Sequence, residues 1–279
     1  MPNPDKYELL KTELSSCGRV SIAFSAGVDS ALLLYAAHEA LGDNVLAITA
    51  DSPVYPKSEL GAAVDFCRRY GIRHEIFDPG ELACEEYAEN PPDRCYICKH
   101  ILMGRMLEIS KSHGIDILAE GSNTDDEGDY RPGMRAIREL GIRSPLREAG
   151  LSKKEIREIS RKIGLSTWDK PSYACLASRI PYGDRITEAK LNMIGQAERV
   201  LKDMGFEQCR VRVHGDLARI ELEEERLSDV MSTAKTRHHI HDRFKQLGFS
   251  YVSLDIMGYR TGSMNEVLDS KDYKDDKKG

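Results

Sequence analysis

The sequence has no long hydrophobic run, so it does not predict a membrane-spanning helix. No apolar segment approaches the roughly 18 residues that such a helix needs. Residues 1–7 also lack the apolar centre of a signal peptide. An excess of positive charge is missing as well, because 40 Lys and Arg residues are set against 46 Asp and Glu residues, giving a net charge of −6. Since nonspecific binding to nucleic acid favours the opposite sign, we expect a cytoplasmic protein with neither a membrane nor a nucleic acid as partner.

The cysteine pattern does not indicate a disulfide framework. The chain has seven cysteines, an odd number, and we expect it in a compartment where thiols stay reduced. A second C-x-x-C is missing, so the single one, Cys95 to Cys98, does not complete a structural zinc site. Four other cysteines are scattered and are interpreted as small packing residues, namely Cys17, Cys67, Cys84 and Cys209.

The sequence does contain a glycine turn between a buried strand and a helix. Residues 19–24 predict the strand and residues 31–37 the helix. The turn between them follows the order Ser-x-Gly-x-Asp-Ser, with Ser25, Gly27, Asp29 and Ser30. Glycine permits close backbone approach, and the N–H groups at a helix start bind phosphate. The Walker lysine before the last serine is absent. The turn therefore predicts a phosphate site of another kind, the alternative being an ordinary turn with a serine cap.

Strands and helices alternate through the first 170 residues. Further strands are predicted at 45–50, 74–77 and 115–120, and helices at 58–70 and 105–113. A helix from Ser152 to about Gly164 begins with a capping box completed by Glu155. The alternation predicts an α/β fold with a doubly wound parallel sheet. Ligands bind such sheets beyond the carboxyl ends of the strands, where the 25–30 and 121–126 loops should both face the site.

The pattern changes after residue 183. A helix at 187–204, a hairpin of strands at 210–213 and 218–222, and then a helix and a strand at 251–256 predict a smaller α+β domain. We place the first domain at 1–175 and the second at 176–268. Residues 269–279 are expected to form a charged, disordered tail.

Three cysteines lie in settings that differ from the rest. Cys95 and Cys98 are three residues apart on the first turn of a predicted helix, where the helix dipole and neighbouring basic residues would lower their pKa. Such a pair fits a redox dithiol, half of a zinc site or part of an iron–sulfur site. Cys175 lies in the segment 170–183. If the three thiolates converge, they can hold a [4Fe–4S] cluster with one iron left open, to which hydrosulfide can bind. Ordinary packing and loop cysteines are the alternative.

The Ser25–Ser30 turn resembles the PP-loop of the ATP pyrophosphatases. Together with the Cys95–Cys98 motif, the 121–126 loop and the 170–183 segment, it resembles the LarE-type ATP-dependent sulfur transferases. The resemblance implies an enzyme that uses ATP and Mg²⁺ to adenylylate the carboxylates of pyridinium-3,5-dicarboxylic acid mononucleotide. Sulfur then replaces the activated oxygen, which yields the organic part of the nickel-pincer nucleotide of lactate racemase. With all three cysteines, the sequence resembles the subtype whose [4Fe–4S] cluster carries the sulfur, and not the subtype in which Cys175 would sacrifice its own.

The resemblance also implies individual roles. Ser25, Gly27, Asp29 and Ser30 would bind the phosphates, with Asp29 acting through magnesium. Lys99 and Asn123 would add to the nucleotide site, while Arg179, Cys95, Cys98 and Cys175 would lie at the centre of the chemistry. Arg210 and Arg212 alternate on one strand face and resemble the arginines that grip the substrate phosphate. Glu221 and Asp229 are candidate metal ligands. The alternatives are a solvated lysine at Lys99, a surface ion pair at Arg179, exposed hairpin arginines at Arg210 and Arg212, and solvated carboxylates at Glu221 and Asp229.

Three other functions stay open. A tRNA-thiolating PP-loop enzyme would share the three cysteines, although the acidic charge balance counts against it. A nonenzymatic nucleotide-binding redox module would leave the 170–183 segment unexplained. An amide-forming PP-loop synthetase would need no cysteines. We expect a small-molecule nucleotide substrate, sulfide or another sulfur donor as second reactant, and a homo-oligomeric protein.

Overall fold

The computed structural model describes residues 4–126, 132–171, 174–260 and 262–265. It divides into two compact units, one of Met1–Glu81 with Asp93–Tyr173 and the other of Leu82–Pro92 with Ala174–Gly279. The second unit includes residues 82–92 because Asn90 Nδ2 donates hydrogen bonds to the carbonyl oxygens of Ile180, Pro181 and Asp184. The expected tail, 269–279, lies outside the described residues.

The first unit is built on a four-stranded parallel sheet, as predicted. Its strands are β1 (Val20–Ala23), β2 (Val45–Ala50), β3 (Arg73–Phe77) and β4 (Leu118–Ala119), in the order β3-β2-β1-β4. The chain moves outward from β1 to β3 and then returns to the other side of β1. Beyond their carboxyl ends, the point between β1 and β4 is where such sheets bind ligands.

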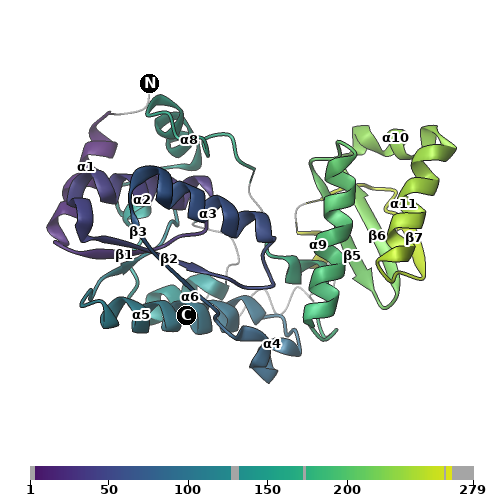
Figure 1. The fold of residues 1–279 in the computed structure, drawn as a ribbon, viewed down its shortest axis with the longest axis horizontal. Helices are drawn as coiled ribbons and strands as arrows, with labels where there is room; N and C mark the ends of the chain where they lie inside the picture. Colours follow the sequence, from purple (N-terminus) through teal and green to yellow (C-terminus); the bar gives the residue numbers. More distant parts are fainter. Residues whose placement is uncertain (1–3, 127–131, 172–173, 261, 266–279) are drawn as a thin grey trace. The chain divides into compact units, whose positions relative to one another are not determined.

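Helices cover both faces of this sheet (Figure 1). One face carries α1 (Pro4–Ser16), α2 (Val28–Leu41), α3 (Lys57–Tyr70), α7 (Pro145–Glu148) and α8 (Lys153–Lys162), and the other carries α5 (Arg94–Ser112) and α6 (Pro132–Glu139). Side chains of β2 alternate between the two cores, because successive strand residues point to opposite faces. The arrangement is therefore the predicted doubly wound α/β fold.

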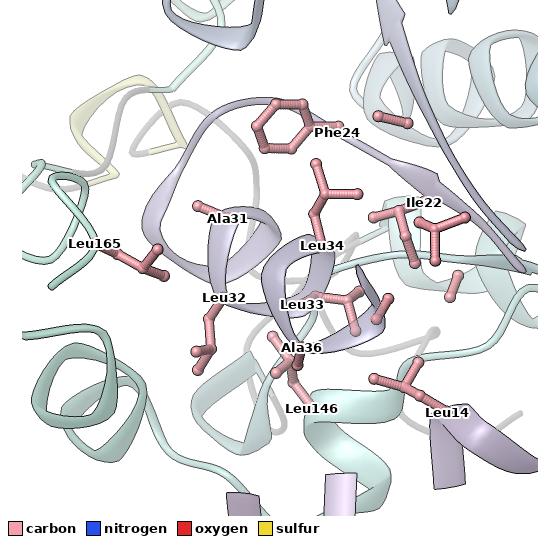
Figure 2. Packing of buried hydrophobic residues seen from close by; sticks show 14 of the residues in the cluster. Leu14, Ile22, Phe24, Ala31, Leu32, Leu33, Leu34, Ala36, Leu146 and Leu165 are labelled. Carbon is pink, nitrogen blue, oxygen red and sulfur yellow. The ribbon is translucent and has the colours of Figure 1, made fainter. Parts of the chain in front are cut away.

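Helix α2 is buried almost all round, which fixes the place of the loop before it. Leu32, Leu33 and Leu34 point in different directions from the helix and are all fully buried (Figure 2). Burying each such side chain contributes about 1.5–3 kcal/mol. A helix that is apolar on every side belongs in a core. The loop that enters α2 is consequently held by a rigid element.

The second unit has a mixed three-stranded sheet. Strands β5 (Cys209–His214) and β6 (Leu217–Leu222) form the predicted antiparallel hairpin, and β7 (Tyr251–Leu254) pairs parallel to β6. The unit also contains α4 (Glu85–Ala88), α9 (Glu188–Asp203), α10 (Leu227–Ser232) and α11 (Ala234–Gln246). Across the described ranges of both units, no helix has the length and apolarity needed to cross a membrane.

Candidate functional site

The Ser25–Ser30 loop leads directly from β1 into α2. Gly27 is the residue before the helix and has no side chain that could cap it. No side-chain cap therefore occupies the N–H groups of the first turn, which are the groups that bind anions at a helix start. The two serines do not cap α2 either. Ser25 Oγ lies 3.1 Å from Ser30 Oγ, which in turn lies 3.3 Å from the carbonyl oxygen of Gly27. Their hydroxyls hold the loop closed on itself, and this favours the phosphate-binding interpretation over the serine-cap alternative.

Asp29 is held by two side chains from distant parts of the chain. Asn123 Nδ2 donates to Asp29 Oδ1 at 3.2 Å, and the ammonium group of Lys153 forms an ion pair with Oδ2. Asn123 follows β4 and Asp29 follows β1, so the structure brings the two predicted loops together at the carboxyl edge of the sheet. The Asp29 carboxylate is an oxygen ligand of the kind that Mg²⁺ prefers, whereas the Asn123 amide turns its nitrogen toward Asp29 and its oxygen accepts the Asp125 N–H at 2.9 Å.

Lys153 is a site residue that the sequence patterns did not indicate. It is the first residue of α8, directly after the Ser152 cap. Its backbone N–H donates to Asp125 Oδ2 at 3.0 Å, which fixes the start of α8 against the 121–126 loop. The sequence held one indication that such a residue exists, namely the missing Walker lysine. A phosphate-binding loop without its own lysine needs a positive charge from another part of the chain.

Gly121 explains why the two loops can lie so close together. A Cβ atom at this position would be 3.0 Å from the backbone nitrogen of Ser30 and 3.2 Å from its Cα. These distances are shorter than ordinary contacts, and the neighbouring atoms are backbone atoms that cannot move aside cheaply. Glycine is therefore required at 121 for the β4 loop to pack on the start of α2.

The C-x-x-C motif lies at the start of α5, which is longer than predicted. This helix begins at Arg94, eleven residues before the start of the predicted helix at 105, so Cys95 and Cys98 are helical. Cys95 is exposed and Cys98 half-buried. Among the residues that the structure describes, no three or more His, Cys, Asp or Glu side chains are grouped to hold a metal ion.

Lys99 lies near a buried carboxylate that the sequence patterns did not single out. Its Nζ atom is 3.9 Å from Glu120 Oε2 at the end of β4. Glu120 is 5% exposed and accepts hydrogen bonds from the hydroxyls of Ser122 and Ser144. Lys99 therefore lies on the same edge of the sheet as Asn123, while its contact with a phosphate stays a prediction.

In the second unit, Arg179 organises the turn that carries Cys175. The Arg179 guanidinium is 1% exposed and donates to the carbonyl oxygens of Ala174 and Cys175 at 2.8 and 2.9 Å. Its Nε donates to Glu198 Oε1 at 2.8 Å, so the charge is neutralised within the unit. Cys175 itself is half-buried. Arg179 thus forms a buried ion pair, unlike the surface pair considered as its alternative. Its observed contacts position the Cys175 backbone.

Arg210 and Arg212 are both buried, yet they differ in their partners. Arg212 donates to both carboxylate oxygens of Glu221, at 3.0 and 2.8 Å, and to the carbonyl oxygen of Ser178 at 2.8 Å. Arg210 is 3% exposed, donates to the Cys209 carbonyl, and has no ion pair within the described part of the chain. Burial lowers the pKa of Arg210, and the nearby positive charge of Arg179 adds to this. A buried guanidinium without a carboxylate is suited to bind an anion.

Glu221 and Asp229 are not brought together as one metal-binding group. Glu221 is fully buried and its oxygens accept from Arg212, Arg219 and Ser263. Asp229 is exposed and pairs with Arg226 at 2.6 Å. In both cases an arginine already compensates the negative charge that would attract a cation.

Comparison with known proteins places the chain in a family. No protein-family model matches the chain. The uncharacterized protein slr1717 of Synechocystis sp. is 42% identical over 263 residues, covering 94% of this chain and 98% of that protein. The pyridinium-3,5-bisthiocarboxylic acid mononucleotide synthase of Lactiplantibacillus plantarum is 35% identical over 264 residues, covering 94% and 95%.

A more distant relative covers only part of the chain. One of the subunits of the glutamine-hydrolyzing GMP synthase of Thermoplasma volcanium is 27% identical over 169 residues, 55% of this chain and 54% of that protein. This partial likeness agrees with a PP-loop fold, whereas the likeness to the pyridinium mononucleotide synthase extends over nearly the full length of both chains. The resemblance seen in the sequence is thereby confirmed, and the chain belongs to the LarE-type family of pyridinium-3,5-bisthiocarboxylic acid mononucleotide synthases.

Proposed function

We propose that this protein is an ATP-dependent sulfur transferase that converts the carboxylates of pyridinium-3,5-dicarboxylic acid mononucleotide into thiocarboxylates. The observation that carries the proposal is the 35% identity with the Lactiplantibacillus plantarum synthase over 94% of this chain. A carboxylate does not release oxide to a sulfur nucleophile at a useful rate. Adenylylation replaces that oxide with AMP as the leaving group and releases pyrophosphate.

The loops after β1 and β4 would carry the adenylylation half of the reaction. We assign the pyrophosphate end of ATP to Ser25, Gly27 and Ser30, and the magnesium ion to Asp29. The Asp29 carboxylate fits this ion, because it is half-buried, supplies oxygen ligands and is held in place by the N–H of the Asn123 amide. Bound magnesium would neutralise phosphate charge as it develops. Lys153 would then be free to move from Asp29 toward a phosphate oxygen, so the positive charge stays within the site.

The sulfur-transfer half would depend on three thiolates. Cys95 and Cys98 are in the first unit and Cys175 in the second. Thiolates are the ligands that hold iron–sulfur clusters, so the donor type fits the [4Fe–4S] cluster that we propose for this chain. When bound, such a cluster would supply sulfur from a renewable source. The chain's own contribution includes the turn at Cys175, which Arg179 holds through two backbone carbonyl oxygens.

The substrate phosphate is proposed to contact Arg210 and Arg212. Arg210 is the stronger of the two candidates, because its buried guanidinium forms no ion pair among the described residues and lies over the Tyr259 ring at 5.0 Å. Arg212 donates two N–H groups to Glu221, one to Ser178 and one to Ser263. A guanidinium has five N–H groups, so Arg212 has one left for a phosphate.

The test combines product analysis with protein mass. Protein prepared without oxygen is incubated with ATP, magnesium, the pyridinium dicarboxylate mononucleotide and sulfide. We expect AMP, pyrophosphate and the thiocarboxylate over many turnovers, with iron bound and Cys175 unchanged in mass. Release of ADP and phosphate would contradict the PP-loop assignment. One turnover by an iron-free chain that becomes lighter by one H₂S would contradict the cluster and identify Cys175 as a sacrificial sulfur donor.

A further inference from the structure

Ala26 has an unusual backbone conformation. It lies in the Ser25–Ser30 loop, which is called the phosphate-binding loop below after its proposed role. The φ angle of Ala26 is +55°, and the only other non-glycine residue with a positive φ in the described ranges is Asn90. Asparagine adopts this left-handed region readily, whereas alanine does so only at a cost because its Cβ approaches the following carbonyl oxygen. Ala26 is also 1% exposed, so its methyl group is committed to the core. Other contacts must therefore keep the loop in this conformation.

Lys170 makes such a contact. Its ammonium group donates to the carbonyl oxygen of Ala26 at 3.0 Å and to Glu59 Oε2 at 2.7 Å. The Lys170 side chain is 19% exposed, so water competes only in part for these bonds. One lysine thus joins the phosphate-binding loop to the first turn of α3, which contains Glu59.

The backbone of Lys170 is itself fixed to the first unit. Arg157 on α8 donates to the carbonyl oxygens of Trp168 and Lys170 at 2.7 and 2.8 Å. The Lys170 N–H donates to the carbonyl oxygen of Thr167 at 3.1 Å. The ammonium group therefore reaches Ala26 from an anchored segment and not from a freely moving one.

We propose that Lys170 is a positioning residue for the ATP phosphates. It holds the Ala26 carbonyl oxygen in the left-handed turn, so that the loop enters α2 at Gly27 with its N–H groups available to phosphate. This inference rests on the proposed function, because it assumes that the Ser25–Ser30 loop binds the pyrophosphate end of ATP. Glu59 neutralises the ammonium group, so Lys170 acts by fixing the loop and contributes little net charge to the site.

The chain offers a matched control for this proposal. Lys6 also bridges a backbone carbonyl oxygen and a glutamate, with 2.7 Å to Gly150 and 2.8 Å to Glu155, and it is similarly half-buried. It contacts neither the phosphate-binding loop nor the segment that precedes Cys175. Lys6→Met therefore measures the general effect of removing such a bridge.

The test measures binding of magnesium pyrophosphate and of MgATP to the full-length protein by calorimetry. We expect Lys170→Met to weaken both at least about tenfold, since a hydrogen bond from a charged group stabilises by roughly that factor. Lys170→Arg keeps donors for both partners and should stay within about threefold of the original protein. Glu59→Gln removes the neutralising charge but keeps the bond to Ala26, so affinity should be unchanged or higher. Lys6→Met should have no effect.

A second measurement separates positioning from general stability. In Lys170→Met, amide hydrogen exchange should accelerate in the peptide that spans residues 24–30, while Lys6→Met leaves that peptide unchanged. Unchanged affinity and exchange in Lys170→Met would overturn the inference, as would an equal loss of affinity in Lys6→Met. If the original protein binds neither probe, the proposed function fails and this inference fails with it. If the original protein binds both probes and Lys170→Met matches it, the positioning role alone fails.

Discussion

Two ion pairs among the candidate site residues, one in each unit, differ in their burial, and the difference indicates what each pair does with its charges. In the first unit, the side chains of Lys153 and Asp29 are 28% and 21% exposed. In the second, those of Arg179 and Glu198 are 1% and 5% exposed. A partly exposed ion pair can exchange one partner for a ligand, because water stabilises the side-chain charge that loses its partner. A buried pair cannot separate without leaving an uncompensated charge in the interior, so it maintains shape.

Arg212 and Glu221 extend the same contrast. Their side chains are 6% and 0% exposed, so this pair belongs with the buried ones. The Lys153–Asp29 pair of the first unit is thus the kind of pair whose charges we propose a nucleotide and its metal ion to take over. The second unit uses arginine–carboxylate pairs to hold β5, β6 and the turn at Cys175 together. Arg210, buried and without an ion pair among the described residues, is the exception among these arginines and is therefore the one that we propose for the substrate phosphate.

The largest expected effect is loss of activity without loss of stability. Asp29→Ala should lower the rate of pyrophosphate release by about three orders of magnitude, because the magnesium ion loses its protein ligand. The thermal unfolding temperature should hardly change, since a half-buried carboxylate on the first turn of α2 contributes no apolar packing to the core. Asp43→Ala, at an exposed carboxylate of the same unit, serves as the control and should keep full activity. An Asp29 variant that unfolds at much lower temperature would place Asp29 among the structural pairs.

The opposite pattern is expected in the second unit. Arg179→Met should lower the free energy of unfolding by about 3–5 kcal/mol, because Glu198 is left buried and unpaired. Replacing both, as Arg179→Met with Glu198→Leu, should restore much of that stability while sulfur transfer stays impaired, since the Arg179 hydrogen bonds to the carbonyl oxygens of Ala174 and Cys175 are lost. Urea unfolding followed by a probe in the second unit measures the first effect. Full additivity of the two single changes would contradict the proposed coupling of this pair.

The fold was predicted well from the sequence, because strands, helices and their caps depend mainly on residues that are close together in the chain. Alternating apolar runs indicated the parallel strands, and the capping box of Ser152 and Glu155 has both of its hydrogen bonds in the structure. The predicted strand at 115–120 is shorter, because only Leu118 and Ala119 pair with β1. The 25–30 and 121–126 loops of the candidate site were also predicted, because each directly follows a predicted strand.

The partners of the site residues could not be predicted in the same way. Lys153 is 124 residues from Asp29, and Lys170 is 144 residues from Ala26. These contacts depend on how α8 and the segment after it pack against the sheet, which periodicity does not indicate. Glu198 was missed for the same reason, because its position on α9 gives no sign that it faces Arg179.

An intermediate effect is expected from the two arginines of β5. Arg210→Ala should raise the KM for the mononucleotide about tenfold to a hundredfold, since a buried charge-assisted contact with phosphate contributes roughly 1.5–3 kcal/mol. Arg212→Ala should mainly lower stability, because Glu221 would remain buried without its main partner. Binding of ATP should be nearly unchanged in both. Steady-state kinetics and urea unfolding of the two variants separate these roles, and equal KM values in all three proteins would exclude phosphate binding by either arginine.

The smallest expected effect concerns acid stability in the first unit. The Lys6 ammonium group, helped by the backbone N–H of Ser152, lowers the pKa of Glu155 to about 2. Because the pKa of Glu155 is lower in the folded chain than in the unfolded chain, where it is about 4.3, the ionised carboxylate stabilises the fold at pH values above 4.3. This stabilisation is lost as the pH falls from about 4.3 toward 2. Because the pair is partly solvated, we expect at most about 1 kcal/mol. Glu155→Gln should therefore be less stable than the original protein at pH 6 by this amount, with the difference vanishing near pH 2. Glu158→Gln on the same helix is the control, and a difference that persisted at low pH would show that Glu155 acts through packing and not through its charge.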